Sequence, residues 1–74
     1  TGVGKAALYS NTTASYNTAV GINTLGANTT GAQNTALGKD ALATSSTGAD
    51  LVAIGYNALD ANTTTSFNTA VGYN

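Results

Sequence analysis

The chain has 74 residues, a net charge of −1, and no Cys, His, Met, Trp or Pro. This length allows at most one small domain, and the lack of Cys excludes disulfides, thiolate metal sites and a cysteine nucleophile. Two lysines are too few to neutralise nucleic-acid phosphates, and no apolar run approaches the roughly 20 residues of a membrane span. Because 42% of the residues are hydrophobic and only 7% are charged, the composition also argues against a disordered chain.

A 17-residue repeat runs through the whole sequence and divides it into units 1–17, 18–34, 35–51, 52–68 and a partial unit 69–74. The consensus is T-A-V-G-Y-N-A-L-x-A-N-T-T-G-x-x-N, whose positions are numbered one to seventeen below. Position four is always glycine: Gly4, Gly21, Gly38, Gly55 and Gly72. Position three is always a branched aliphatic residue: Val3, Val20, Leu37, Ile54 and Val71. Position eight is always leucine: Leu8, Leu25, Leu42 and Leu59.

A unit of this length favours one coil of a β-solenoid. A helical-hairpin repeat needs about 33 residues, and the invariant glycine and the Thr/Asn-rich positions eleven to fourteen disfavour a single helix. One repeat per coil would stack equivalent residues about 4.8 Å apart. We therefore predict an all-β fold, either a two-sided parallel β-roll with an extended turn or a three-sided β-helix, and the whole chain as a single repeat array.

In each coil the first predicted element is a strand over positions one to five. Alternation sends Ala and Gly at positions two and four to one face, and Thr and the aliphatic residue at positions one and three to the other. A narrow interior suits the Ala/Gly face, which would turn the aliphatic column outward toward something that buries it. However, position five holds Lys5 and Lys39, which must reach water, and the glycine can bend the chain. The sequence therefore leaves open which face is interior.

The rest of each coil is predicted to turn. Positions six to eight carry the next apolar anchor, and positions eleven to thirteen read Asn-Thr-Thr or Ser-Ser-Thr, which form side-chain-to-backbone turn bonds. Asn returns at position seventeen in Asn17, Asn34 and Asn68, with Leu51 as the exception. Stacked Asn side chains at coil corners are expected to satisfy one another's amides from coil to coil.

Four segments carry a resemblance to known repeat arrays: NTAVG at 17–21, NTALG at 34–38, LVAIG at 51–55 and NTAVG at 68–72. The unit resembles the head repeats of trimeric autotransporter adhesins, and also arrays in tail-fibre-like and surface proteins of bacteria and phages. The better-known adhesin repeat is shorter, so the turn is longer here. The resemblance implies a left-handed parallel β-roll and a homotrimer that buries the aliphatic column. We further expect a position on a cell or virion surface, with a host-surface or glycan ligand as a candidate partner.

The charged residues do not form a catalytic or metal-binding pattern. Asp40, Asp50 and Asp60 occupy different repeat positions, and their spacing matches no calcium loop. Lys39 and Asp40 are expected to form a solvated pair at a turn. The opening TGVGK lacks the spacing of a phosphate loop. We therefore expect no enzyme activity and no cofactor or metal.

Surface modification and sugar contacts are the remaining candidate sites. Asn11, Asn28 and Asn62 each begin an N-x-[ST] sequon in one column, so they are either glycan acceptors or turn residues that happen to match. Aromatic residues recur at position sixteen (Tyr16, Phe67) and position five (Tyr56, Tyr73), where they would contact sugars, cover the roll or fill a trimer interface.

The leading functional prediction is a structural segment of an extracellular fibre, self-associating as a homotrimer, as an end-to-end filament, or as both. The pattern starts abruptly and stops within a repeat, at position six, so we expect a window of a longer fibre. The alternative is an ice-binding or carbohydrate-binding solenoid that uses Thr and Asn ladders. Against ice binding, the Thr columns at positions twelve and thirteen are adjacent, so an extended backbone would point them to opposite sides.

Overall fold

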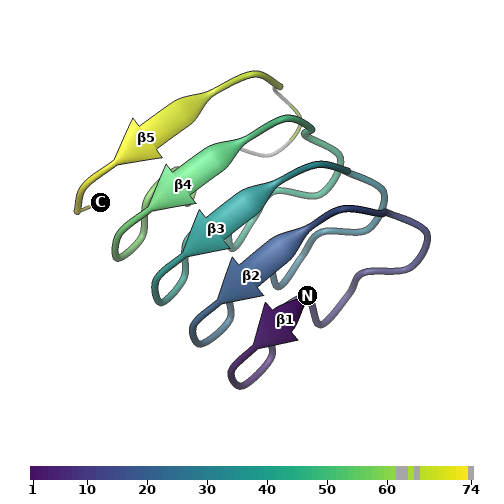
Figure 1. The fold of residues 1–74 in the computed structure, drawn as a ribbon, viewed down its shortest axis with the longest axis horizontal. Coiled ribbons are helices and arrows are strands. Elements are labelled where there is room, and N and C mark those ends of the chain that lie inside the picture. The colour runs from purple at the N-terminus through teal and green to yellow at the C-terminus, as the bar shows by residue number, and fades with distance from the viewer. Residues whose placement is uncertain (62–63, 65, 74) are drawn as a thin grey trace.

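The computed structural model describes residues 1–61, 64 and 66–73, and this part of the chain is all-β. Its regular elements are five short strands: β1 (Gly2–Val3), β2 (Thr18–Val20), β3 (Thr35–Leu37), β4 (Val52–Ile54) and β5 (Thr69–Val71). They form one open parallel sheet in the order β1-β2-β3-β4-β5, with a loop returning from each strand to the start of the next (Figure 1). This arrangement is consistent with a β-solenoid. None of the described segments forms a helix that could cross a membrane.

Each of the first four strands pairs with the strand that follows it, and paired residues are seventeen positions apart. Ala19 lies opposite Ala36, which in turn lies opposite Ala53. The backbone ladder extends past the strands on both sides, since the amide of Thr18 donates to the carbonyl of Asn34 at 2.9 Å. The rest of each coil is built of turns and bends. The five strands therefore form the one β-sheet among the described residues.

The strands end at position three because of the glycine that follows. The glycines at position four have φ between 120° and 137°, a region that side-chain-bearing residues rarely adopt. A Cβ on Gly4 would also lie 2.6 Å from the carbonyl oxygen of Gly21. The backbones of successive coils therefore meet at this column. The predicted strand over positions one to five is wrong in its last two residues, where the chain bends.

The Ala face of the sheet is the interior. Ala19, Ala36 and Ala53 at position two are at most 1% exposed, whereas the Thr residues at position one lie in solvent. Leu25 and Leu42 at position eight pack into the same core and are fully buried. A small residue at position two lets the leucine from the opposite side of the coil approach the sheet closely. The question that the sequence left open is thus settled, and the aliphatic column points outward.

Leucine reaches the core through a left-handed turn. Residues at positions six and eight have positive φ in every complete coil, with Leu25 and Leu42 at 52° and 53°. This conformation is unfavourable for Leu by about 1–2 kcal/mol. Two gains offset the strain: the side chain is buried, and the amide of Leu25 donates to the carbonyl of Ala41 in the next coil at 3.0 Å. Three of the four residues at position six are Asn or Asp, which tolerate this conformation.

The Asn residues at position seventeen join successive coils through the backbone. The Oδ1 atom of Asn17 accepts a hydrogen bond from the amide of Asn34 at 2.9 Å, and its Nδ2 donates to the carbonyl of Gly31 at 2.8 Å. Asn34 repeats this pattern with the amide of Leu51 and the carbonyl of Gly48. The expectation that these side chains satisfy one another's amides is wrong for this column. Rung-to-rung pairing of amides occurs instead at position eleven, where Asn28 Nδ2 donates to Asn11 Oδ1 at 3.1 Å.

Candidate interaction surface

The outward face of the sheet carries a column of aliphatic side chains at position three. Val3, Leu37 and Val71 are 54%, 46% and 73% exposed, and Val20 and Ile54 are half-buried. In-register pairing places these five residues, here called the aliphatic ladder, on consecutive rungs about 4.8 Å apart. A ladder of this kind is a continuous apolar strip, because no charged residue interrupts it.

Position five adds a second outward column beside the ladder. It begins with Lys5 and Ile22 and ends with an aromatic stack, in which the rings of Tyr56 and Tyr73 have centroids 5.3 Å apart and planes 15° apart. Lys39 lies one coil earlier, with its Nζ atom 5.2 Å from the centre of the Tyr56 ring. The two rings thus face each other, so the ring faces inside the stack are not available to a sugar.

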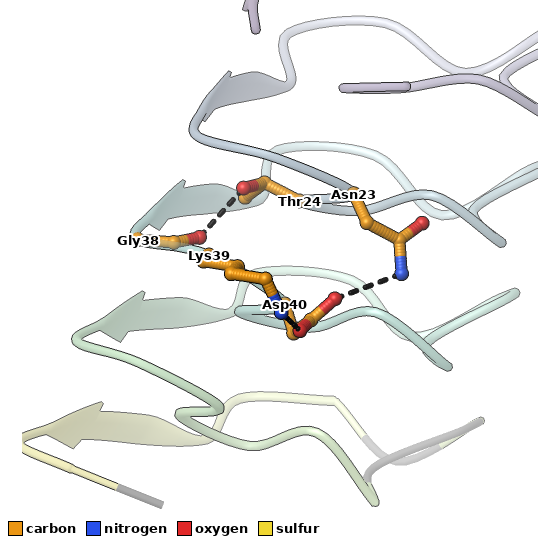
Figure 2. A network of polar contacts seen from close by, with 5 residues as sticks. All are labelled: Asn23, Thr24, Gly38, Lys39 and Asp40. Atoms are coloured by element: carbon orange, nitrogen blue, oxygen red, sulfur yellow. Dashed lines mark hydrogen bonds and ion pairs between the residues drawn. The ribbon is translucent and has the colours of Figure 1, made fainter. Parts of the chain in front are cut away.

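Two of the charged residues, Lys39 and Asp40, take part in a polar network at the turn after β3 (Figure 2). Lys39 Nζ lies 2.6 Å from Asp40 Oδ2, and Asn23 Nδ2 from the preceding coil donates to Asp40 Oδ1 at 2.9 Å. The Lys39 hydrogen bond, followed by that of Asn23, lowers the pKa of the Asp40 carboxyl. The Asp40 bond raises the pKa of Lys39 in turn. The predicted solvated pair is confirmed, and it belongs to a contact that ties two coils together.

A buried hydroxyl reinforces the same junction. Thr24 at position seven is fully buried and donates from Oγ1 to the carbonyl of Gly38 in the next coil at 2.6 Å (Figure 2). The other coils hold Ala at this position. Polar contacts between the second and third coils therefore lie both inside the turn and on its surface.

The sequons differ in their access to solvent. Asn28 is fully buried, and its Nδ2 atom donates to Asn11 and to the carbonyl of Gly31. A glycan would replace one of the two hydrogens that Nδ2 donates, and the fully buried atom leaves no room for a sugar, so the structure argues against Asn28 as an acceptor. Asn11 is half-buried and its Nδ2 donates to the carbonyl of Ala14 at 3.2 Å. Asn62 lies outside the described residues.

The two Thr columns of the long turn serve different roles. At position twelve, Thr12 Oγ1 donates to the carbonyl of Thr29 at 3.1 Å, and Thr29 repeats this bond toward Ser46. At position thirteen, Thr13, Thr30 and Thr47 are exposed. The hydroxyls of one column are therefore engaged along the stack, and the two columns do not form a shared flat array of free hydroxyls.

Three further aromatic residues stand in solvent. Tyr16 and Phe67 at position sixteen are 85% and 80% exposed, and Tyr9 at position nine is 81% exposed. The backbone of position sixteen has positive φ in every complete coil, and the side chain there faces outward. The sequence pattern does not single out Tyr9, because its column otherwise holds Gly, Ala and Asp. Two coils separate Tyr16 from Phe67, so this column is no continuous aromatic platform.

The described residues bring together no cluster of three metal-ligating side chains. A hollow of about 480 Å³ lies beside the last coils and is lined by Ala58, Leu59, Asp60, Ala61, Ala70, Val71, Gly72 and Tyr73. Its single carboxylate, on Asp60, has no basic partner in that lining. This hollow therefore does not place a carboxylate beside a basic side chain.

Comparison of the chain with protein-family models, with curated proteins and with solved structures gives no match.

Proposed function

We propose that the chain is a structural segment of an extracellular fibre, and that copies associate side by side as a homotrimer through the aliphatic ladder. The observation that carries the proposal is the position of the ladder. The interior of each coil is filled by Ala and Leu, and a second set of larger aliphatic side chains remains on the outward face of the sheet. A contiguous exposed apolar strip of this kind is typical of an interaction site.

The size of the molecule fits a lateral interface. A stable interface buries about 800 Å² on each partner, which is about one fifth of the 3825 Å² surface of this chain. A closed trimer gives each chain two neighbours, so its contacts would cover about two fifths of that surface. Burying apolar surface contributes about 25 cal/mol per Å², so the ladder and the adjoining Ile22 provide the driving force.

The distribution of charge supports the same face. Charged side chains are depleted at interface centres and tolerated at their rims. Lys5 and Lys39 sit at position five, beside the ladder, and Lys39 holds its charge in an ion pair with Asp40. The long lysine side chains keep their ammonium groups in water while a partner covers the aliphatic groups.

A homotrimer is the assembly that the resemblance to autotransporter heads implies, and the stacking of coils suits a fibre. Each coil is bonded to the next by the strand ladder, by Asn17 and Asn34, and by the left-handed turns. Every added coil would extend such a stack by about 4.8 Å without a new kind of contact. The proposed role is to supply length and stiffness at a cell or virion surface.

The test is the mass and shape of the chain in solution. Sedimentation or light scattering is expected to give the mass of three copies, and electron microscopy of longer arrays is expected to show rods of uniform width. Leu37→Lys places a charge at the centre of the ladder and is expected to yield monomers. The matched control Thr47→Lys adds the same charge at an exposed position of the opposite turn and should leave the trimer intact.

A wild-type monomer at high micromolar concentration would overturn the trimer. Equal behaviour of the two lysine variants would show that the ladder is not the interface. Rods that lengthen with protein concentration, with lateral mass unchanged by Leu37→Lys, would instead indicate end-to-end association of coils.

A further inference from the structure

Two tyrosines stack on consecutive coils at one end of the position-five column. The strand pairing of Ile54 with Val71 holds their backbones one rung apart and in register. The ring centroids of Tyr56 and Tyr73 are 5.3 Å apart, and the planes differ by 15°. The side chains are 41% and 78% exposed, so a solvent-borne reagent reaches both rings.

The other two tyrosines lack such a neighbour. Tyr9 and Tyr16 are more exposed, but the next coil holds Gly26 and Gln33 at their positions. Tyr56 and Tyr73 are the one stacked aromatic pair that the structure describes. In the column order, Tyr56 stands between the Lys39 ammonium group, 5.2 Å from its centre, and the ring of Tyr73. Its nearest aromatic partner in the folded chain is therefore Tyr73.

We propose that Tyr56 and Tyr73 are a dityrosine cross-linking site that joins adjacent coils. The oxidant is a peroxide-dependent one-electron system, such as a haem peroxidase with hydrogen peroxide. Each phenol loses one electron and one proton to give a phenoxyl radical, and the peroxide is reduced to two molecules of water. A carbon–carbon bond then forms between ring carbons ortho to the two oxygens, and each ring regains its aromaticity by moving the ortho hydrogen to its oxygen.

The stack favours this reaction because it holds the two rings together before either is oxidised. Rotation about exposed side-chain bonds brings the ortho carbons within bonding range, and the parallel backbones need not separate. The product closes a covalent loop over one coil, which restricts the unfolded chain and raises the midpoint of thermal unfolding by several degrees. The site is intramolecular, so it does not depend on the proposed fibre.

The experiment treats the dilute 74-residue chain with a haem peroxidase and hydrogen peroxide, followed by a protease that cuts before Asp. Cleavage before Asp50 and Asp60 separates Tyr56, in peptide 50–59, from Tyr73, in peptide 60–74, whereas Tyr9 and Tyr16 stay in 1–39. The expected product is a monomer with dityrosine fluorescence. Its digest contains 50–59 joined to 60–74, at the summed mass less two hydrogen atoms.

Variants and an unfolded control separate the stack from general tyrosine reactivity. Tyr56→Phe and Tyr73→Phe keep the aromatic ring and are each expected to lower the yield of monomeric dityrosine at least tenfold. Tyr9→Phe and Tyr16→Phe are expected to leave it unchanged. In urea, links from peptide 1–39 should appear alongside the pair. The proposal is overturned if the folded chain forms no dityrosine, forms it only between molecules, or links Tyr9 or Tyr16 as readily as the stacked pair.

Discussion

Ser45 interrupts the Asn column at position eleven, and Ser45→Asn is expected to stabilise the chain. At position eleven, Asn28 Nδ2 donates to Asn11 Oδ1 at 3.1 Å and to the carbonyl of Gly31 at 2.9 Å. The third coil has Ser45 at this position, whose side chain is too short to continue the pattern. As a result, Asn28 Oδ1 and Ser45 Oγ are both buried without a hydrogen-bond partner.

The substituted amide has both acceptors and space. By the repeat, its Nδ2 would donate to Asn28 Oδ1 and to the carbonyl of Gly48, which corresponds to Gly31. That carbonyl already accepts from Asn34 Nδ2, and the Gly31 carbonyl likewise accepts from two Asn side chains. A Cβ on Gly31 would lie 2.7 Å from Asn28 Oδ1, so the glycine of the second coil leaves room for this Asn side chain. The third coil has the same glycine, Gly48.

The magnitude follows from the atoms involved. A buried unsatisfied acceptor is unfavourable by about 1–3 kcal/mol, and a new hydrogen bond contributes a net 0.5–1.5 kcal/mol, roughly. Ordering a longer side chain opposes this by up to about 1 kcal/mol. The expected gain is therefore about 1–2 kcal/mol, or a rise in the melting temperature of about 5–10 °C for a chain of this size.

Thermal and urea unfolding, followed by circular dichroism at one fixed protein concentration, measure this gain. The matched control is Thr47→Asn, which adds the same amide two residues away at an exposed position and should change stability by less than about 0.5 kcal/mol. If Ser45→Asn lowers stability, or changes it no more than the control does, then the unpaired oxygens of Asn28 and Ser45 do not destabilise the chain, and the prediction is wrong.

Two further perturbations test other columns of the array. Gly38→Ala places a Cβ 2.6 Å from the carbonyl oxygen of Gly55 at a φ of 127°, and should destabilise the chain by more than about 3 kcal/mol in urea unfolding, whereas Gly2→Ala, without positive φ, should have a much smaller effect. The pKa of Asp40 is lowered, so its stabilising contribution is present above the ordinary carboxyl pKa and is lost as pH falls through the lowered folded value. The pKa of Lys39 is raised, so its contribution is lost as pH rises through the raised folded value. Melting temperatures of wild type and Asp40→Asn should therefore differ slightly at neutral pH and converge in acid. A difference that persists below the pKa of Asp40 in both the folded and the unfolded chain would contradict a stabilising role of its charge.

The repeat predicted the parallel strands and their partners, because side chains one coil apart share a position. It did not predict where the strand ends or which face is interior. Both depend on the glycine at position four, whose close backbone contact appears only when coils are stacked. A strict alternation of faces continued through Gly21 to Ile22 therefore misses the bend that the glycine introduces. The left-handed φ of Leu25 was equally hidden, because Leu has no preference for that conformation and adopts it here for the burial that follows.

The Asn columns show a second limit of the sequence. Asn17 and Asn11 are the same residue type at two corners, and composition alone assigns both to side-chain ladders. In the structure, the Oδ1 of Asn17 bonds to a backbone amide of the next coil, and that of Asn11 accepts from an Asn side chain. This difference explains why position seventeen accepts Leu51. The amide of Leu51 still donates to Asn34 Oδ1, so the exchange removes no donor from the preceding coil.

The direction in which a side chain points relative to the stack determines how much the residue type at its repeat position varies between coils. A Cβ at position four would point into the next backbone, so only glycine occurs there. At position sixteen the side chain leaves the stack, and Tyr16, Gln33, Asp50 and Phe67 follow one another without disturbing the coil. Position five is also outward, and there the variation from Lys39 to Tyr56 and Tyr73 builds an ion pair and an aromatic stack on an unchanged backbone. The repeat thus fixes the backbone of each coil, and the outward columns are the places where one coil acquires chemistry that its neighbours lack.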